Sequence, residues 1–259
     1  MKRRTLLAYA LGALGGYALT KGALAEPFMG EAFILNTAFG TPISNPDGTG
    51  FFDRLMHAAF GELGVSVAVQ HPPAERALIL ANAGIDDGDG PRIPGLDTTW
   101  SYPNLVRVPE KLLDVDFAAF SLQPGITIDG WADLSKYEVA IVTGWKILER
   151  HLHGHKSVLH VKDAEHLFRL LKHRRAQVVV IDRYSGIETA HRIGLFDICI
   201  SQPVLDKQPM YLYLNVRHAD IASAVSDTLG QMKRDGRYEA VFQETLGHVI
   251  NQYCASESG

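Results

Sequence analysis

The chain has 259 residues and a formal net charge of −4 at pH 7, with 46% hydrophobic and 21% charged residues. A chain of this length can bury one large core or two modest ones. Its acidic balance makes it a poor partner for nucleic acid or for an anionic membrane surface.

The first 25 residues have the features of a cleavable export signal. A basic start (MKRR) is followed by an apolar run and by the small-x-small sequence Ala23-Leu24-Ala25, which predicts cleavage before Glu26. The arginine pair followed by Thr-Leu-Leu also fits a twin-arginine signal, and general secretory export remains an alternative. Removal of residues 1–25 lowers the basic residues from 25 to 21 against 29 acids, so the mature net charge becomes −8. We therefore expect a periplasmic protein.

The part that follows predicts a lobe of alternating strands and helices. Residues 32–39 are expected to form a strand, 52–63 a helix with one apolar face, and 65–69 a second strand. Pro73 predicts the start of the next helix, because proline loses no usable N–H at the first helical position. The stretch IDDGDGPRI, residues 85–93, is too polar and glycine-rich for a core element, and its DDGDG part is expected to be a solvent-facing turn.

A second block of alternating elements predicts a second lobe with a mostly parallel sheet. Its expected strands cover residues 138–142, 158–161, 178–181 and 197–200. Its expected helices cover residues 145–152, 164–173 and 183–194. Asp163 is placed to cap the second of these helices. Two amphipathic helices, around residues 221–232 and 238–250, are expected to pack back on the first lobe.

Two similar phrases bracket this second block. A leucine-aspartate step leads into the strand at 115–120, and another precedes the strand at 210–216. Such a pair of strands on either side of an inserted α/β unit is what a two-lobed protein with a double hinge requires. We therefore expect residues 26–114 and 210–259 to form one lobe and residues 115–209 the other.

In these segments the chain resembles the periplasmic solute-binding proteins of ABC transporters that serve polar amino acids, bacterial extracellular solute-binding family 3. The resemblance lies in P-x-E-R-A-L at 73–78, G-x-D-D-G-D at 84–89 with Arg92, YPNLVRV at 102–108, and the strand at 115–120. It implies a type II periplasmic-binding-protein fold, an α/β fold of two lobes joined by two hinge strands. It also implies a monomer without a cofactor. Such a protein captures an amino acid or related zwitterion between its lobes for an inner-membrane ABC permease.

The resemblance also implies ligand-binding residues, each with a structural alternative. Thr143 and Gly144 would help to hold a ligand carboxylate, or form an ordinary strand-to-helix turn. Asp182 would bind the ligand's ammonium group, or cap the helix that follows it. Phe39 would offer an aromatic shelf to the ligand, or pack in the core.

Arg76 and Arg92 compete as the clamp for a ligand carboxylate, since an arginine can hold a carboxylate with two parallel hydrogen bonds. The family's usual clamp lies in a T-x-x-R phrase, which is replaced here by RIPGLDTTW. Arg92 is nearest to that position, whereas Arg76 matches the P-x-E-R-A-L motif. Trp100 and Tyr102 are expected to form an exposed lip over the cleft.

Other chemistries have weaker support. His151, His153 and His155 could suggest a metal site, but their side chains would diverge at a helix end, so a solvated segment is expected. A dehydratase-like enzyme of the same fold is one alternative function, with Glu75, Asp89 or Asp182 as acid or base. A sensory binding protein is another. A disulfide between Cys199 and Cys254, the two cysteines of the chain, is allowed but not implied.

Overall fold

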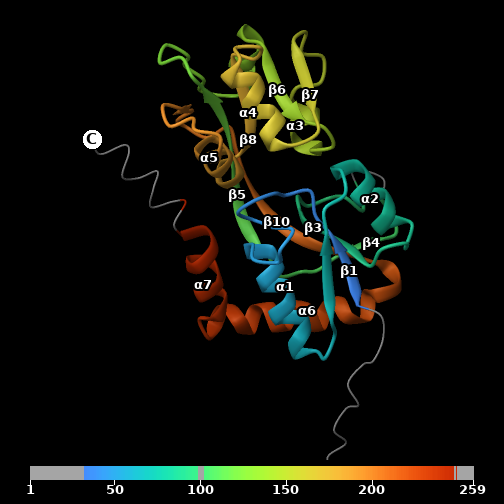
Figure 1. Ribbon diagram of the computed structural model, residues 1–259. Coiled ribbons are helices and arrows are strands. Elements are labelled where there is room, and N and C mark those ends of the chain that lie inside the picture. The colour runs from blue at the N-terminus through green and yellow to red at the C-terminus, as the bar shows by residue number, and fades with distance from the viewer. Residues whose placement is uncertain (1–31, 99–101, 248, 250–259) are drawn as a thin grey trace, which may run out of the picture.

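The computed structural model describes residues 32–98, 102–247 and 249. The expected signal segment, Trp100 and Cys254 lie outside this part of the chain. Figure 1 shows two groups of strands and helices, one above the other, connected by β5 and β10. No helix of the described segments is long and apolar enough to cross a membrane.

The first lobe is built around a short parallel sheet. Strand β1 (Phe33–Asn36) pairs in parallel with β2 (Val67–Gln70) on one side and β3 (Gly88–Arg92) on the other. Strand β4 (Leu105–Arg107) joins through β10. The helices of this lobe are α1 (Phe51–Glu62), α2 (Ala74–Asn82), α6 (Ala219–Arg234) and α7 (Arg237–Phe242), the last continuing into a π-helical turn at Gln243–Gly247.

Helix α1 provides much of the first lobe's core. Its fully buried apolar residues recur three or four positions apart, as the sequence predicts: Phe51, Phe52, Leu55, Met56, Ala59 and Phe60. Each large side chain buried in this way contributes about 1.5–3 kcal/mol. The helix begins where the backbone N–H of Gly50 donates to the Asp53 carboxylate at 3.0 Å.

Strand β3 contradicts the expected solvent-facing turn, because all five of its residues are buried. It lies between β1 and β10 in the interior of the sheet. A Cβ atom on Gly88 would lie 2.5 Å from the carbonyl oxygen of Tyr213, so glycine is required by the close approach of the two backbones. Asp89 is fully buried, and its carboxylate is neutralised by Arg92 at 2.8 Å. Close backbone packing and an internal ion pair thus replace the apolar side chains of an ordinary core strand.

The second lobe has the same design. Strand β6 (Val139–Val142) pairs in parallel with β7 (Val158–Val161) and β8 (Val178–Asp182). Its helices are a 3-10 helix at Trp131–Lys136, then α3 (Lys146–His151), α4 (Ala164–Lys172) and α5 (Arg183–Arg192). The short strand β9 (Cys199–Ile200) pairs with β5. The predicted cap of α4 is confirmed, because Asp163 accepts a hydrogen bond of 2.9 Å from the backbone N–H of His166.

The two lobes are joined by β5 (Leu113–Ser121) and β10 (Asp206–Asn215), which are antiparallel over Leu113–Phe117 and Asp206–Met210. Beyond this paired region, β5 continues against β8 in the second lobe, and β10 continues against β3 and β4 in the first. Each strand therefore passes from one lobe to the other through the paired region. This confirms the expected α/β class with two hinge strands, while the residue ranges expected for the lobes stay a prediction.

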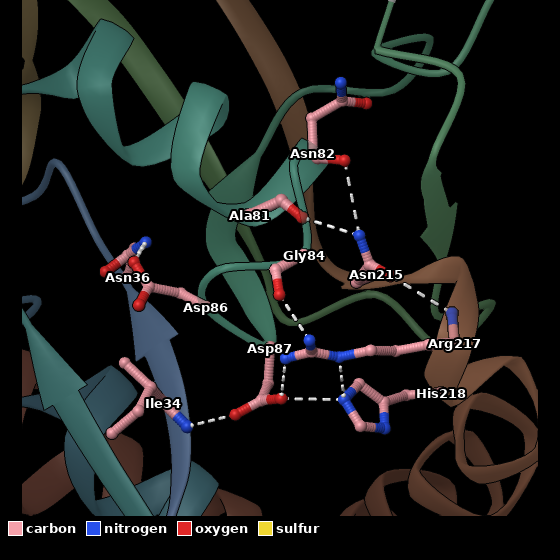
Figure 2. Close-up of polar contacts among 10 residues, drawn as sticks. All are labelled: Ile34, Asn36, Ala81, Asn82, Gly84, Asp86, Asp87, Asn215, Arg217 and His218. Carbon is pink, nitrogen blue, oxygen red and sulfur yellow. Dashed lines mark hydrogen bonds and ion pairs between the residues drawn. The ribbon is translucent and has the colours of Figure 1, made fainter.

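A polar network holds the first lobe together at the amino ends of β1 and β3 (Figure 2). We call it the Asp87 clamp: Asp87, Arg217, His218 and the backbone of Ile34. One oxygen of the Asp87 carboxylate accepts a hydrogen bond of 2.8 Å from the Ile34 N–H. The other oxygen pairs with Arg217 and lies 2.7 Å from Nε2 of His218. The segment that leads from β10 into α6 is thereby fixed to β1.

Candidate functional site

A cleft of about 600 Å³ lies between the two lobes. The first lobe lines it with the loop after β1, including Thr37 and Phe39, and with the loop between β2 and α2, including His71. The second lobe contributes Trp145, Ser185 and the start of α4. In open α/β sheets, ligands bind beyond the carboxyl ends of the strands, and here the carboxyl ends of β1, β2 and β6 reach the cleft. The cleft is therefore the candidate ligand site.

The inner end of the cleft is closed by two aromatic rings from opposite lobes. The ring centroids of Phe39 and Trp145 are 4.9 Å apart, and Trp145 also meets the edge of Phe117 at 5.9 Å. A small cavity of about 30 Å³ lies beside this contact, next to Arg92 and Lys146. Phe39 thus lines the cleft, as the sequence predicts for a shelf, but its buried ring packs against Trp145.

Two side chains that line the cleft carry buried polar atoms without a hydrogen-bond partner among the described residues, Trp145 Nε1 and Ser185 Oγ. Leaving such a group unsatisfied costs about 1–3 kcal/mol. The side chains of Trp145 and Ser185 both line the cleft. Neither atom has accessible surface in this arrangement of the lobes, so a polar solute would supply the missing partner only after the cleft wall rearranges.

Asp182 caps α5, which confirms the structural alternative for this residue. Its Oδ1 accepts a hydrogen bond of 2.8 Å from the backbone N–H of Ser185. The carboxyl is fully buried, and this burial raises its pKa to about 6 although the backbone hydrogen bond from Ser185 opposes the shift. The binding of a ligand ammonium group stays a prediction, since Asp182 does not line the cleft, although Ile181 and Ser185 do.

The two candidate arginines differ in their position relative to the cleft. Arg92 borders the small inner cavity, but its guanidinium donates to Asp89 and to the carbonyl oxygen of Ala74 at 3.0 Å. Burial raises the pKa of Asp89 in spite of the adjacent charge of Arg92. Arg76 is exposed on α2 and does not line the cleft. Of the two, only Arg92 is near the space between the lobes.

Thr143 and Gly144 form the turn after β6, and Gly144 brings the second lobe against the first. Its φ of +85° is the left-handed conformation that favours glycine. A Cβ atom there would lie 2.8 Å from the Ala74 side chain and 2.8 Å from the backbone N of Glu75. Thr143 is exposed, and its backbone N–H donates to Val161 at 2.9 Å. The turn is therefore a contact between the lobes at the start of α2.

Beside this contact, an ion pair crosses from one lobe to the other. Lys146 of α3 pairs with Glu75 of α2, and Glu75 also accepts a hydrogen bond of 2.8 Å from the Tyr102 hydroxyl. Burial alone would raise the pKa of Glu75, but the bonds from Lys146 and Tyr102 outweigh it and lower the pKa. We call Glu75, Tyr102 and Lys146 the interlobe latch. Tyr102 is buried in this latch, so the exposed lip expected at this residue is wrong.

A third feature of the cleft was not predicted. The Ser44 hydroxyl donates to the buried Asp53 carboxylate at 2.5 Å. Its only proton is then used, so its oxygen accepts from Nε2 of His71 at 2.8 Å. Burial lowers the pKa of His71, and the nearby Asp53 charge opposes this effect. Ser44, Asp53 and His71 match no sequence motif, and only their approach in the fold reveals the chain of hydrogen bonds.

The described residues contain no group of three or more His, Cys, Asp or Glu side chains that could hold a metal ion. The three histidines of the HLHGHK segment point to separate partners where contacts are described. His151 stacks on Trp131, and His155 lies 2.7 Å from the carbonyl oxygen of Leu134. Cys199 is a free thiol in the described part of the chain.

Comparison with known proteins supports the fold. No family model matches the chain. An uncharacterized protein of Shewanella oneidensis is 26% identical over 193 residues, which cover 72% of each chain. A mutant of the T. maritima arginine-binding protein ArgBP superimposes with a TM-score of 0.72 at 16% identity, covering 83% of this chain and 95% of that one.

Two other solved structures have the same architecture. A histidine kinase sensor domain similar to periplasmic binding proteins gives a TM-score of 0.73 at 16% identity, covering 84% of this chain and 96% of that one. AncCDT-1, an ancestral amino-acid-binding precursor of cyclohexadienyl dehydratase, gives 0.68 at 17% identity, covering 83% and 95%. The chain therefore has the type II periplasmic-binding-protein fold, as its sequence predicts.

Proposed function

We propose that this protein is an exported receptor that binds a small polar solute between its two lobes and delivers it to an ABC permease in the inner membrane. The main observation in support is the cleft of about 600 Å³, whose walls carry buried polar atoms without partners in the described chain. Solved proteins with the same fold include the arginine-binding protein and the ancestral amino-acid-binding protein named above. An amino acid or related zwitterion is accordingly the proposed ligand class, and the receptor acts as a monomer without a cofactor.

Binding works by shifting the protein between open and closed arrangements of the lobes. We place residues 26–114 and 210–259 in the first lobe and residues 115–209 in the second. The hinge lies where β5 and β10 pair, so rotation about this pair opens the cleft without disturbing either core. A solute closes the lobes only if it binds the closed form more tightly than the open form. Contacts that form on closure, at Gly144 and in the interlobe latch, add to the stability of the closed form.

Within this proposal, the predicted site residues have unequal support. Phe39 lines the cleft, Arg92 borders its inner cavity, and Thr143 with Gly144 lies where the lobes meet. Asp182 does not line the cleft, but it retains one unsatisfied oxygen within the described structure. The exposed position of Arg76 gives no support to a role in ligand binding.

A dehydratase-like enzyme is less well supported by the site. Its candidate acids Glu75, Asp89 and Asp182 are held by the interlobe latch, by Arg92 and by the cap of α5, respectively. A sensory role shares the same cleft and differs only in the partner of the closed form, as the similarity to a kinase sensor domain illustrates.

The proposal is tested by a thermal-shift screen of the protein lacking residues 1–25 against amino acids, polyamines and small organic acids. A ligand present at 100 times its Kd stabilises the folded state by about 2.7 kcal/mol, which raises the melting temperature measurably. We expect at least one solute to do so without being consumed. Consumption of the solute would favour the enzyme, and the absence of any shift across the panel would contradict the receptor function.

A further inference from the structure

Charge is divided unequally between the two lobes. Residues 115–209, placed in the second lobe, contain 12 basic and 11 acidic residues, a net charge of +1. The rest of the chain without residues 1–25 contains 9 basic and 18 acidic residues, a net charge of −9. The net charge of the whole chain predicts a poor partner for an anionic membrane, but charges act over short distances in salt solution. A membrane would therefore meet the local charge of one face of the protein, and not its total charge.

The positive charge of the second lobe is concentrated where α4 and α5 end beside each other. Lys172, the last residue of α4, donates a hydrogen bond of 2.9 Å to the carbonyl oxygen of Ile193, directly after α5. The segment 172–175, KHRR, is exposed along its whole length. Further cations lie on the two helices themselves. We call the five cations of this face the basic patch: Arg169, Lys172, Arg174, Arg175 and Arg192.

Carboxylates neutralise only part of the basic patch. Glu165 pairs with Arg169 at 2.7 Å and with Arg192 at 2.9 Å, so two arginines share one acid. These bonds lower the pKa of Glu165 to about 2, so the acid stays ionised. The other three cations of the patch form no ion pair with any residue of the described chain. Helix α5 and the turn after it add two acids, Glu188 and Asp197, which still leaves an excess of positive charge.

Stabilisation of the helix ends does not account for the whole patch. The helix dipole favours cations in the last turn of a helix, which explains Lys172 and Arg192. Arg174 and Arg175 lie beyond the end of α4. Arg174 has a φ of +55°, a conformation that favours glycine, so glycine would end this helix better. The charges of these two arginines are therefore better explained by a partner than by the helix.

The patch surrounds a basin and lies next to an exposed aromatic ring. The basin has a volume of about 490 Å³, and its lining residues are Glu165, Arg169, Lys172, His173, Arg192 and Ile193. Phe196, in the turn after α5, is 72% exposed, and its ring centroid lies 5.6 Å from that of His191. Among the described residues of α4, α5 and the turns after them, it is the one large hydrophobic side chain that is exposed. Clustered cations beside an exposed aromatic ring are typical of surfaces that bind anionic membranes.

We propose that this face of the second lobe binds the surface of a bilayer that contains anionic phospholipid. The cations pair with lipid phosphate groups, the basin receives a headgroup, and Phe196 enters the interface beside it. An acidic protein surface would also match the cations, but a protein interface has an apolar core, whereas a bilayer accepts a single ring. Because Glu165 and Arg192 also line the cleft, the bound protein holds the mouth of its cleft near the membrane. Such binding goes beyond the receptor function, since it needs neither solute nor permease.

The test of the charges is co-sedimentation of the protein lacking residues 1–25 with lipid vesicles. One set of vesicles is phosphatidylcholine alone, and the other is equal parts of phosphatidylcholine and phosphatidylglycerol. The double variant Arg174→Glu with Arg175→Glu reverses two charges of the patch. The control is Lys156→Glu with Arg234→Glu, which makes the same change at exposed positions outside the patch.

We expect the native protein to bind only the vesicles that contain phosphatidylglycerol. A Lys or Arg near an anionic surface strengthens binding about fivefold, so the double variant in the patch should bind about thirtyfold more weakly, or less. The control should bind nearly as the native protein does, because charges beyond about 10 Å are screened at 0.1 M salt. Binding of the native protein should disappear at 1 M salt, where the Debye length falls to about 3 Å.

The ring is tested separately, so the proposal stays testable if the charge variant does not fold. Phe196→Ser keeps every charge and should weaken binding to the anionic vesicles about tenfold, because the ring no longer leaves water. Leu159→Ser is the control, since Leu159 is also exposed, at 42%, but lies on β7. It should leave binding unchanged.

Several results would overturn membrane binding. The first is that the native protein does not sediment with anionic vesicles, and the second is that both patch variants bind them as tightly as the native protein. Binding of polyglutamate without binding of vesicles would assign the patch to an acidic protein surface. Binding of inorganic phosphate in calorimetry, again without binding of vesicles, would assign the basin to a free anion. None of these results bears on the receptor function, which the solute screen tests.

Discussion

Two aspartates show how differently the molecule treats a buried carboxylate. Burial would raise the pKa of Asp87, but hydrogen bonds from Ile34, Arg217 and His218 outweigh it and lower the pKa (Figure 2). Burial raises the pKa of Asp182 to about 6, since Ser185 satisfies only one of its oxygens. Asp87 precedes the amino end of β3, whereas Asp182 is the last residue of β8. Asp87 holds the segment between β10 and α6 against β1. Asp182 caps α5, next to residues that line the cleft.

The two aspartates also differ in whether both of their carboxylate oxygens have partners. In the Asp87 clamp, both carboxylate oxygens have partners within the described chain. In contrast, one oxygen of Asp182 has none there, and neither does the hydroxyl of Ser185. An unsatisfied buried group reduces the stability of the empty protein. Such groups also occur in residues that do not line the cleft, at Asn36, Asn45 and Asp89.

The largest loss of stability is expected when the Asp87 clamp is broken. Asp87→Ala leaves Arg217, His218 and the Ile34 N–H without their common acceptor, and should lower the free energy of unfolding by about 2–4 kcal/mol. Arg217 is partly exposed, and solvent screening keeps the loss within this range. Urea denaturation measures it. Asp227→Ala, at an exposed position of α6, is the control and should change stability little. Equal losses in the two variants would show that the clamp does not stabilise the lobe.

Asp182→Asn should raise the free energy of unfolding, whereas Asp87→Ala lowers it. The pKa of Asp182 is about 6 in the folded protein against an ordinary value of 3.8, so the unfolded chain releases this proton first as the pH rises. Stability is thereby lost between about pH 4 and pH 6 and does not recover above it. Asparagine keeps the helix cap without the charge, and should gain about 1–3 kcal/mol at pH 7. Denaturation at several pH values measures the gain.

The clamp supplies the control for this pH dependence. The lowered pKa of Asp87 means that its contribution is present above its ordinary pKa and is lost as the pH falls through the lower folded value. Asp182→Asn should therefore remove a slope between pH 4 and pH 6 that Asp87→Ala leaves in place. A slope that persists in Asp182→Asn would show that another group causes it.

A smaller effect is expected at the contact between the lobes. Gly144→Ala introduces a Cβ atom 2.8 Å from Ala74 and forces alanine into a φ of +85°. The conformation costs about 1–2 kcal/mol of stability, and the collision should also weaken solute binding by opposing closure. Gly154→Ala is a matched control, since Gly154 has a φ of +80° with nothing within 4 Å of the added atom. It should lose similar stability without loss of affinity. Equal affinities in both variants would argue against closure at Gly144.

The smallest effect is expected from the interlobe latch. Glu75→Gln removes the charge that meets Lys146, but the Glu75 side chain is 45% exposed, so solvent screening limits the loss to about 1 kcal/mol or less. The lowered pKa of Glu75 means that the contribution is present above its ordinary pKa of 4.5 and is lost as the pH falls through the lower folded value. Small-angle X-ray scattering should show a larger radius of gyration for the empty variant at pH 7. An unchanged radius would show that the latch does not hold the lobes together.

Part of the candidate site could be predicted from the sequence because it depends on strand ends. Phe39 follows β1, Thr143 and Gly144 follow β6, and Asp182 ends β8. Recognising the strands therefore placed Phe39 at the cleft and Gly144 at the contact between the lobes. The partners of these residues were not predictable. The sequence predicts only that Trp145 begins a helix, whereas its ring meets Phe39, more than a hundred residues earlier in the chain.

Local patterns in the sequence were sufficient for most of the elements, because helical and strand periodicities and caps involve residues only a few positions apart. The two-lobed architecture was inferred from the two similar strands on either side of the second block and from the family resemblance. The face of α1, the continuous apolar run of β8 and the Asp163 cap are of this kind. Only the tertiary structure decided that Gly88–Arg92 is a buried strand, because its burial depends on the approach of the Tyr213 backbone. It likewise decided that Glu75 meets Lys146, 71 residues further on. Such contacts depend on how the lobes close, and no short stretch of sequence contains that information.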